Sequence, residues 1–207
     1  PPPPEQIDSQ EELYLTGLHV EQYKHPLIDP EPYWEKALRN DAGDVRCNNA
    51  LGLAHLRRGN LTIAEEHFRR AIRTLTRRNP NPRDGEPYFN LGLALKYQGR
   101  LDEAYAAFYK AIWSYAWQAA GYYHIATINV CQGDYDAALE HLDRSLAANT
   151  LNLKARNLKA AVLRRLKRWD EAEALARETA ALDALDYGSR NELILAAHAR
   201  GDGAAAQ

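Results

Sequence analysis

The chain contains no methionine, two cysteines and three phenylalanines among its 207 residues. Two cysteines cannot supply the dense disulfide framework of small secreted domains. The chain has 26 lysines and arginines and 28 acidic residues, and its formal charge of -2 argues against a nucleic-acid binder, which usually has a basic stripe. No run of about 18 apolar residues is present, as a membrane-spanning helix requires. The 45% hydrophobic content is ordinary for a folded soluble protein, and we expect neither nucleic acid nor membrane as a partner.

The two cysteines and the N-terminal residues indicate the cellular compartment in which the protein is expected. Cys47 and Cys131 fall at different positions of the repeat described below, too far apart for a disulfide, and free thiols are typical of a reducing cytoplasm. Residues Pro1 to Pro4 lack the basic and apolar stretches of a secretory signal. We therefore expect a cytoplasmic protein. Because the sequence has no initiator methionine, we also expect it to be a piece of a longer protein.

A pattern of small and aromatic residues recurs along the chain at a fixed interval. Gly99, Gly133 and Lys167 are evenly spaced along the sequence. Four copies of the pattern are Gly52, Gly59, Ala64 and Phe68; Gly92, Gly99, Ala104 and Phe108; Ala126, Gly133, Ala138 and Leu142; and Ala160, Lys167, Ala172 and Ala176. This interval and signature resemble the tetratricopeptide repeat, a pair of helices joined by a turn. The resemblance implies an all-α fold, a right-handed superhelical solenoid of antiparallel helix pairs.

The repeat period predicts the boundaries along the chain. One interval is longer than the others, because extra residues with two prolines lie between Thr74 and Asp84. The predicted ranges are a proline-rich linker 1–10, a degenerate repeat 11–44, a repeat with an extended linker 45–84, repeats 85–118, 119–152 and 153–186, a capping helix 187–200 and a frayed tail 201–207.

The residue that follows the first helix of each repeat is expected to adopt a left-handed backbone conformation. Gly59, Gly99 and Gly133 suit that conformation because glycine has no Cβ atom. Lys167 takes the same place in the fourth repeat, where a side chain costs about 1 kcal/mol.

No motif of catalysis or metal binding is present. The sequence has no nucleophile elbow, phosphate-binding loop or zinc-protease helix, and no histidine pair has metal-ligand spacing on one helix face. His67, His141 and the pair Glu65-Glu66 are expected on exposed helix faces. We therefore expect a non-catalytic protein without cofactor or metal.

The remaining candidate site is the inner face of the solenoid, formed by the first helix of each pair. Residues expected to bind a ligand in this concave groove are Asn49, Phe89, Asn90, Tyr97, Tyr123, His124 and Asn157. A basic rim is expected from Arg46, Lys96, Arg77, Arg78 and Arg83. Asparagine both donates and accepts hydrogen bonds, and aromatic faces bury apolar ligand groups. The pattern predicts a scaffold that binds a peptide or a protein domain.

Two alternatives to this site are open, and a third kind of site is not expected. The face could be solvated, with the partner bound elsewhere. An aromatic cluster that includes Trp113 and Trp117 is interpreted as core, but exposure of either ring would indicate a docking patch. A carboxylate clamp for chaperone tails is not expected, because among its required positions only Asn90 carries the right residue.

Five segments also resemble one bacterial family. They are Glu31–Glu35, Arg46–Gly52, Asn79–Pro82, Asp84–Tyr88 and Ala116–Ala120. They are similar to the helical-repeat region of large bacterial proteins that carry an uncharacterised N-terminal β-sandwich domain of galactose-mutarotase-like fold. The resemblance implies an alternative function, an accessory domain of a carbohydrate-active or sugar-binding protein whose partner is its own N-terminal domain. It transfers no catalytic residue, and it leaves the ligand and the oligomeric state open.

Overall fold

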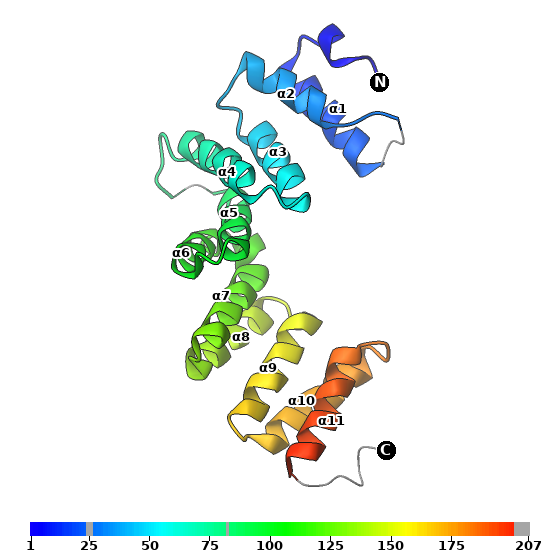
Figure 1. Cartoon of the computed structure of the whole chain (residues 1–207), viewed down its shortest axis with the longest axis vertical. Helices are drawn as coiled ribbons and strands as arrows, with labels where there is room; N and C mark the ends of the chain where they lie inside the picture. The colour runs from blue at the N-terminus through cyan, green and yellow to red at the C-terminus, as the bar shows by residue number, and fades with distance from the viewer. Residues whose placement is uncertain (24–26, 82, 201–207) are drawn as a thin grey trace. The chain divides into compact units, whose positions relative to one another are not determined.

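The computed structural model describes residues 1–23, 27–81 and 83–200, and over these residues it contains helices and no strand (Figure 1). The all-α prediction is confirmed. The helices group into two compact units, residues 1–111 and residues 112–207. The predicted tail, 201–207, lies outside the described residues.

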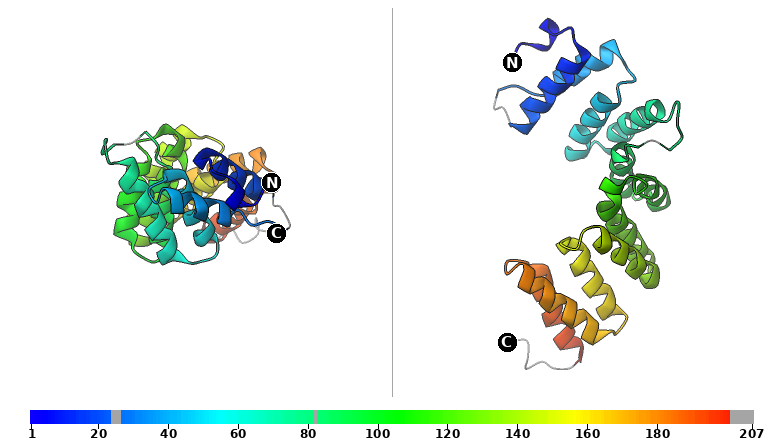
Figure 2. Two further views of the ribbon diagram at one scale, coloured as in Figure 1. Left: turned by 90° about the horizontal axis from the view of Figure 1, so that it is seen from above. Right: turned by 180° about the vertical axis from the view of Figure 1, so that it is seen from behind.

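The first unit holds three helix pairs preceded by a short 3-10 helix (Figures 1 and 2). Its elements are η1 (Pro4–Gln6), α1 (Gln10–Gln22), α2 (Glu31–Asn40), α3 (Val45–Arg57), α4 (Leu61–Leu75), α5 (Glu86–Tyr97) and α6 (Leu101–Ala111). Each helix packs most closely on its neighbours in sequence, and α3 also contacts α5.

The second unit follows the same plan. Its elements are η2 (Tyr115–Trp117), α7 (Gln118–Gln132), α8 (Tyr135–Ala148), α9 (Leu153–Arg165), α10 (Trp169–Leu182) and α11 (Tyr187–Arg200). Polar side chains fix several helix starts, because Asp44, Asp134 and Asn152 accept hydrogen bonds from backbone N–H groups in the first turns of α3, α8 and α9.

Several residues of the predicted proline-rich linker 1–10 pack against α2. Ile7 is buried in the same core cluster as Tyr33 and Trp34. The Tyr33 hydroxyl donates to the carbonyl of Pro2 at 2.9 Å, and Lys36 Nζ donates to the carbonyl of Ile7 at 2.8 Å. The segment is therefore an ordered part of the first pair.

The core between paired helices depends on a small residue facing a large one. Phe68 lies against Gly52, and Phe108 lies against Gly92 so closely that a Cβ atom at residue 92 would stand 2.6 Å from Phe108 Cε1. Both rings are fully buried. In the second unit, Ala126 and Leu142 share one core cluster at the corresponding positions. The approach of the two helices is therefore set by the combined size of the two side chains.

The turn between paired helices adopts the predicted left-handed conformation. The backbone φ angles are 79° at Gly59, 77° at Gly99 and 81° at Gly133, and Lys167 has a φ of 61°. The prediction that Lys167 takes the place of these glycines is confirmed.

Replacing Lys167 by glycine is expected to stabilise the protein by about 1 kcal/mol, because the left-handed conformation costs an L-residue about that much. Urea unfolding followed by circular dichroism measures the change. The matched control is Arg165→Gly, in the last turn of α9, which is expected to destabilise by about 1 kcal/mol because glycine is a poor helix former. A lower unfolding free energy for Lys167→Gly contradicts the prediction.

Candidate functional site

A pocket of about 120 Å³ lies between the first helices of the first unit, α1, α3 and α5. An apolar part and an acidic part make up its walls. The apolar and aromatic lining consists of Tyr14, Leu18, Val45, Ala50, Leu53 and Pro87, and the polar lining consists of Glu21, Arg46, Asn49, Asp84 and Glu86. Three of the four charged residues in this lining are acids.

The predicted asparagines hold the wall of this pocket together. Asn49 Nδ2 donates to Glu86 Oε1 at 2.8 Å, and Asn90 Nδ2 donates to Asn49 Oδ1 at 2.9 Å. Asn49 is 8% exposed and Asn90 is 3% exposed. Their amides join α3 to α5, so Asn49 lines the pocket with little free surface and Asn90 lies behind it.

The arginine in the pocket is held by the protein itself. Arg46 donates to both carboxylate oxygens of Glu11, at 2.5 and 3.1 Å, and its guanidinium lies 4.4 Å from the centre of the Tyr14 ring. The hydrogen bond from Arg46 lowers the pKa of Glu11 despite some desolvation. The positive charge of Arg46 is thus compensated within the chain.

Two acids of the pocket have no such compensation. Asp84 and Glu86 form no ion pair within the described part of the chain, where Glu86 accepts from the Asn49 amide and Asp84 accepts from the Glu86 backbone N–H at 2.9 Å. The third acid, Glu21, pairs with Arg57. The pocket therefore carries a net negative charge.

Two larger pockets lie beside the second helices and differ in their charges. One, of about 330 Å³, lies among α8, α9 and α10, and the other, of about 270 Å³, lies among α4, α5 and α6. In the first, Asp143 pairs with Lys159 and Arg168 pairs with Glu171. In the second, Arg69 pairs with Glu103. Each of these ion pairs lies within the lining of its own pocket, whereas the lining of the α1–α3–α5 pocket contains two acids without an ion-pair partner among the described residues.

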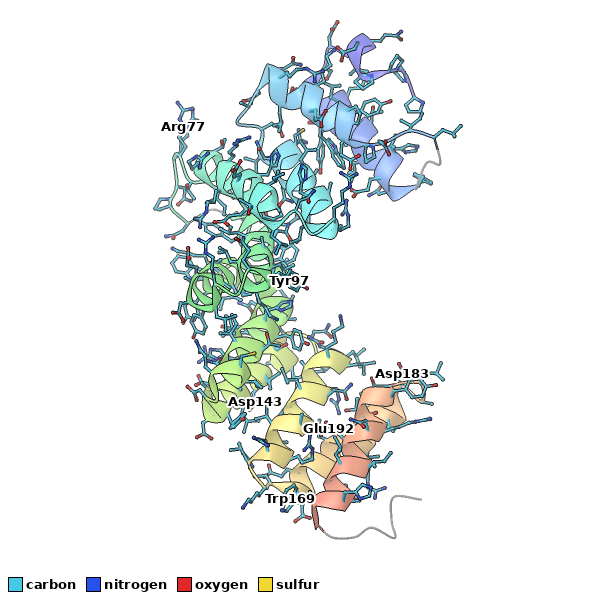
Figure 3. All side chains as sticks on the ribbon, viewed as in Figure 1. Arg77, Tyr97, Asp143, Trp169, Asp183 and Glu192 are labelled. Carbon is cyan, nitrogen blue, oxygen red and sulfur yellow. The ribbon has the colours of Figure 1, made fainter. Side chains whose placement is uncertain are left out.

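The other predicted residues of the first unit lie away from this pocket. Phe89 is buried, with its ring centre 5.6 Å from that of Phe108. Tyr97, next to Lys96 at the C-terminal end of α5, is 64% exposed (Figure 3). The expected rim, Arg77, Arg78 and Arg83, is exposed on the loop between α4 and α5, and Figure 3 shows Arg77 projecting outward. This loop gives the pocket an acid, Asp84, and none of these arginines.

Sequence reasoning missed Asp84 and Glu86. Acids at the start of a helix are so common, because they favour the positive end of its dipole, that their presence alone indicates no site. The signal that could have identified them is the Asn49 amide one repeat earlier, which needs an acceptor on the next helix.

The predicted residues of the second unit form a separate set. The rings of Tyr123 and His124 are partly buried and meet edge to face, with centres 5.1 Å apart. Asn157 Nδ2 donates to both carboxylate oxygens of Asp186, at 2.9 and 3.0 Å. Asn157 thus repeats the contact that Asn49 makes with Glu86, between a first helix and an acid at the start of the next.

Of the two tryptophans in the predicted aromatic cluster, one is exposed. Trp113, just after α6, is 57% exposed, whereas Trp117 in η2 is partly buried. The interpretation of this segment as core is therefore wrong for Trp113, which leaves it as a second candidate surface.

The histidines expected on exposed faces are wholly or partly buried, which corrects the sequence-based expectation. His141 is buried and lies 3.0 Å, through Nδ1, from Asn129 Oδ1. His67 is partly buried, with Nδ1 3.1 Å from Asn48 Oδ1. Asn48 uses its Nδ2 to donate to the carbonyls of Ala42 and Asp44, so its oxygen must accept from His67. Both imidazoles therefore bridge the two helices of a pair.

The pKa of His67 falls to about 4, chiefly because burial disfavours the charged ring and secondarily because of the charge of Arg70. A pKa lower in the folded than in the unfolded state contributes stability above the unfolded value of about 6.5, which is lost as the pH falls towards 4. We expect the unfolding free energy to decrease between pH 7 and pH 5. The decrease should be smaller in His67→Gln, while the exposed-site control His198→Gln should keep the wild-type slope. Equal slopes in all three proteins contradict this assignment.

Among the described residues, no cluster of three or more histidine, cysteine or carboxylate side chains could hold a metal ion. In that same part of the chain, every helix is too short or too polar to cross a membrane.

Comparisons with known proteins agree with the fold. Family models of the tetratricopeptide repeat match residues 44–112 and residues 126–187. PilF of Pseudomonas aeruginosa is 18% identical over 95% of this chain and 88% of its own, with a TM-score of 0.78. PilW, described as a type IV pilus biogenesis factor, is 18% identical over 97% and 90%, with a TM-score of 0.78. YrrB, described as having an unusual peptide-binding site, is 17% identical over 82% and 84%, with a TM-score of 0.64. At these identities the likeness concerns the fold alone.

Proposed function

Because this chain is built from tetratricopeptide repeats, we propose that it is a non-catalytic scaffold that binds a segment of a partner protein between α1, α3 and α5. The observation that carries the proposal is the pocket between these first helices, with an apolar wall beside uncompensated acids. YrrB, which has this fold, is described as having a peptide-binding site, and this supports the same class of ligand here.

The size of the pocket favours a peptide over a larger small molecule. Sites for drug-sized ligands occupy about 300 to 1,000 Å³. A pocket of about 120 Å³ admits a single side chain, as expected where an extended peptide lies along a groove and anchors one residue in it. The asparagine bridge between α3 and α5 fixes the pocket wall before the ligand binds, which reduces the entropic cost of binding.

A phage-displayed library of random dodecapeptides, selected on the whole chain, tests this function. Ala50 lines the pocket, so Ala50→Leu is expected to fill it and to weaken the selected peptides by about tenfold or more in calorimetric titration. The matched control is Ala106→Leu, on the exposed face of α6, which should bind as the wild type does. Failure to enrich any peptide, or equal binding by Ala50→Leu, overturns the proposed function.

A further inference from the structure

We propose that the α1–α3–α5 pocket receives a lysine or arginine side chain of the bound peptide, with Glu86 and Asp84 as the acceptors of its charged head. This inference rests on the proposed function and names the chemical class of its ligand. Its occupant is one basic residue within an extended segment of a partner protein.

The two halves of the pocket match the two halves of a basic side chain. Lysine and arginine carry an aliphatic stem that packs on apolar surface and a cationic head that stays with polar groups. Leu18, Ala50 and Leu53 supply the apolar wall, on two neighbouring first helices. Asp84 and Glu86 supply the acidic edge at the start of the next first helix, α5.

The charged residues of the pocket also favour a positively charged ligand group. Glu86 uses one oxygen, Oε1, for the Asn49 amide, and Asp84 uses one, Oδ1, for the backbone of Glu86. Each carboxylate accepts at two oxygens, so each retains an oxygen for a cationic donor. An anionic ligand has no comparable partner, because Arg46 already donates to both oxygens of Glu11.

A basic ligand is opposite in charge to one that the expected basic rim would attract. The arginines of the α4–α5 loop favour an acidic partner, whereas the acid from that same loop lines the pocket. The carboxylates are held in position, since Asn49 orients Glu86 and α5 begins immediately after Asp84 and Gly85. Charged hydrogen bonds formed by such prearranged groups contribute more than those of mobile surface acids.

Peptides from the display selection test the inference directly. We expect the enriched sequences to carry a lysine or an arginine at one fixed position. Synthetic versions in which norleucine replaces that lysine, or citrulline replaces that arginine, keep the shape of the stem and remove the charge. Their dissociation constants, measured by calorimetric titration on the whole chain, are expected to rise about tenfold.

Protein variants provide the second measurement. Glu86→Gln keeps an oxygen that can accept from Asn49 and removes the negative charge, so it is expected to weaken a lysine peptide about tenfold and a norleucine peptide hardly at all. Asp84→Asn should show the same selectivity to a smaller degree. Glu66→Gln, on the exposed face of α4 outside the pocket, is the matched control and should bind both peptides as the wild type does. Circular dichroism verifies that each variant is folded.

The outcomes separate this inference from the proposed function. Peptides that bind in the pocket without a basic residue, or with equal affinity for the lysine and norleucine versions, overturn the inference and leave the peptide-binding function intact. Peptides whose binding is insensitive to Ala50→Leu overturn both.

Discussion

The Gly92→Ala variant is expected to lose about 2 kcal/mol of unfolding free energy, within the range that overpacking of a core costs, and adding Phe108→Leu is expected to restore most of it. A Cβ atom at residue 92 would stand 2.6 Å from Phe108 Cε1, so the ring or the helix must shift. A leucine at residue 108 frees the space that the new methyl group needs.

The second unit contains the compensated pair naturally. Ala126 and Leu142 stand where Gly92 and Phe108 stand in their own repeat, and both are fully buried. The double variant therefore copies a combination that this chain already uses. Phe108→Leu alone should cost about 1 kcal/mol, because the smaller side chain leaves a void beside Gly92.

Urea unfolding of the wild type, the two single variants and the double variant measures the coupling between the two sites. Contacting residues deviate from additivity by about 0.5 to 3 kcal/mol, and here the sign should favour the double variant. The reciprocal exchange is the matched control. Leu142→Phe should destabilise, and adding Ala126→Gly should recover stability. Additive effects in both cycles refute the view that helix spacing depends on the combined size of the pair.

The Glu65→Ala variant is expected to lose about 2 kcal/mol of unfolding free energy, because it removes the buried carboxylate that Arg69 and Arg100 share. Glu65 is 9% exposed, although it stands in a charged run expected to face solvent. Arg100 donates to both of its oxygens, at 2.7 and 2.9 Å, and Gln98 and Arg69 each donate at 2.9 Å. Without Glu65, Gln98 loses this acceptor, and Arg69 and Arg100 keep Glu103 as their remaining carboxylate partner. Loss of one partner costs several kcal/mol when burial is complete. The partial exposure of Arg100 reduces that cost here.

Glu65 joins the second helix of one repeat to the turn of the next. Its loss should therefore weaken the packing between neighbouring repeats. The matched control is Glu66→Ala, because Glu66 is exposed and pairs with Arg70 at 3.7 Å. Surface ion pairs contribute about 0 to 1 kcal/mol, and the control should change stability by less than about 0.5 kcal/mol. Equal losses in the two variants contradict the structural role of Glu65.

Lowering the pH should reproduce part of this loss of unfolding free energy in the wild type. Burial raises the pKa of Glu65, but the hydrogen bonds from Gln98, Arg69 and Arg100 outweigh it and hold the pKa below its usual value. A carboxylate with a lowered folded pKa stabilises the protein above its unfolded pKa, and this stability is lost as the pH falls below about 4.5. The difference in stability between wild type and Glu65→Ala should therefore shrink below pH 4.

Particular residues show how far the sequence predicts this structure. The position of Lys167 follows from spacing alone, because the turn of every repeat imposes the same backbone conformation. The recurrence of a glycine and a phenylalanine at fixed repeat positions is also read from spacing, and the structure adds that the two pack against each other within one helix pair. These features are local to one helix pair, where the repeat period determines which residues meet.

Features formed between repeats could not be predicted in the same way. Glu65 and Arg100 meet because a turn follows α5, and nothing in the acidic run distinguishes Glu65 from Glu66. The pocket depends on how α1, α3 and α5 approach one another, which decides that Asp84 lines it and that Asn90 lies behind it. Burial of a polar side chain depends on this tertiary packing, and the repeat pattern does not predict it.

Within each unit, helices pack chiefly on their neighbours in sequence, and this has a consequence for how the chain denatures. Few contacts tie distant segments together, so one repeat can open without opening all the others. The dependence of unfolding free energy on urea concentration scales with the surface exposed in one cooperative step. The measured slope should therefore be compared with the slope expected if all 207 residues unfold together. A smaller measured slope would indicate how many repeats unfold in one cooperative step.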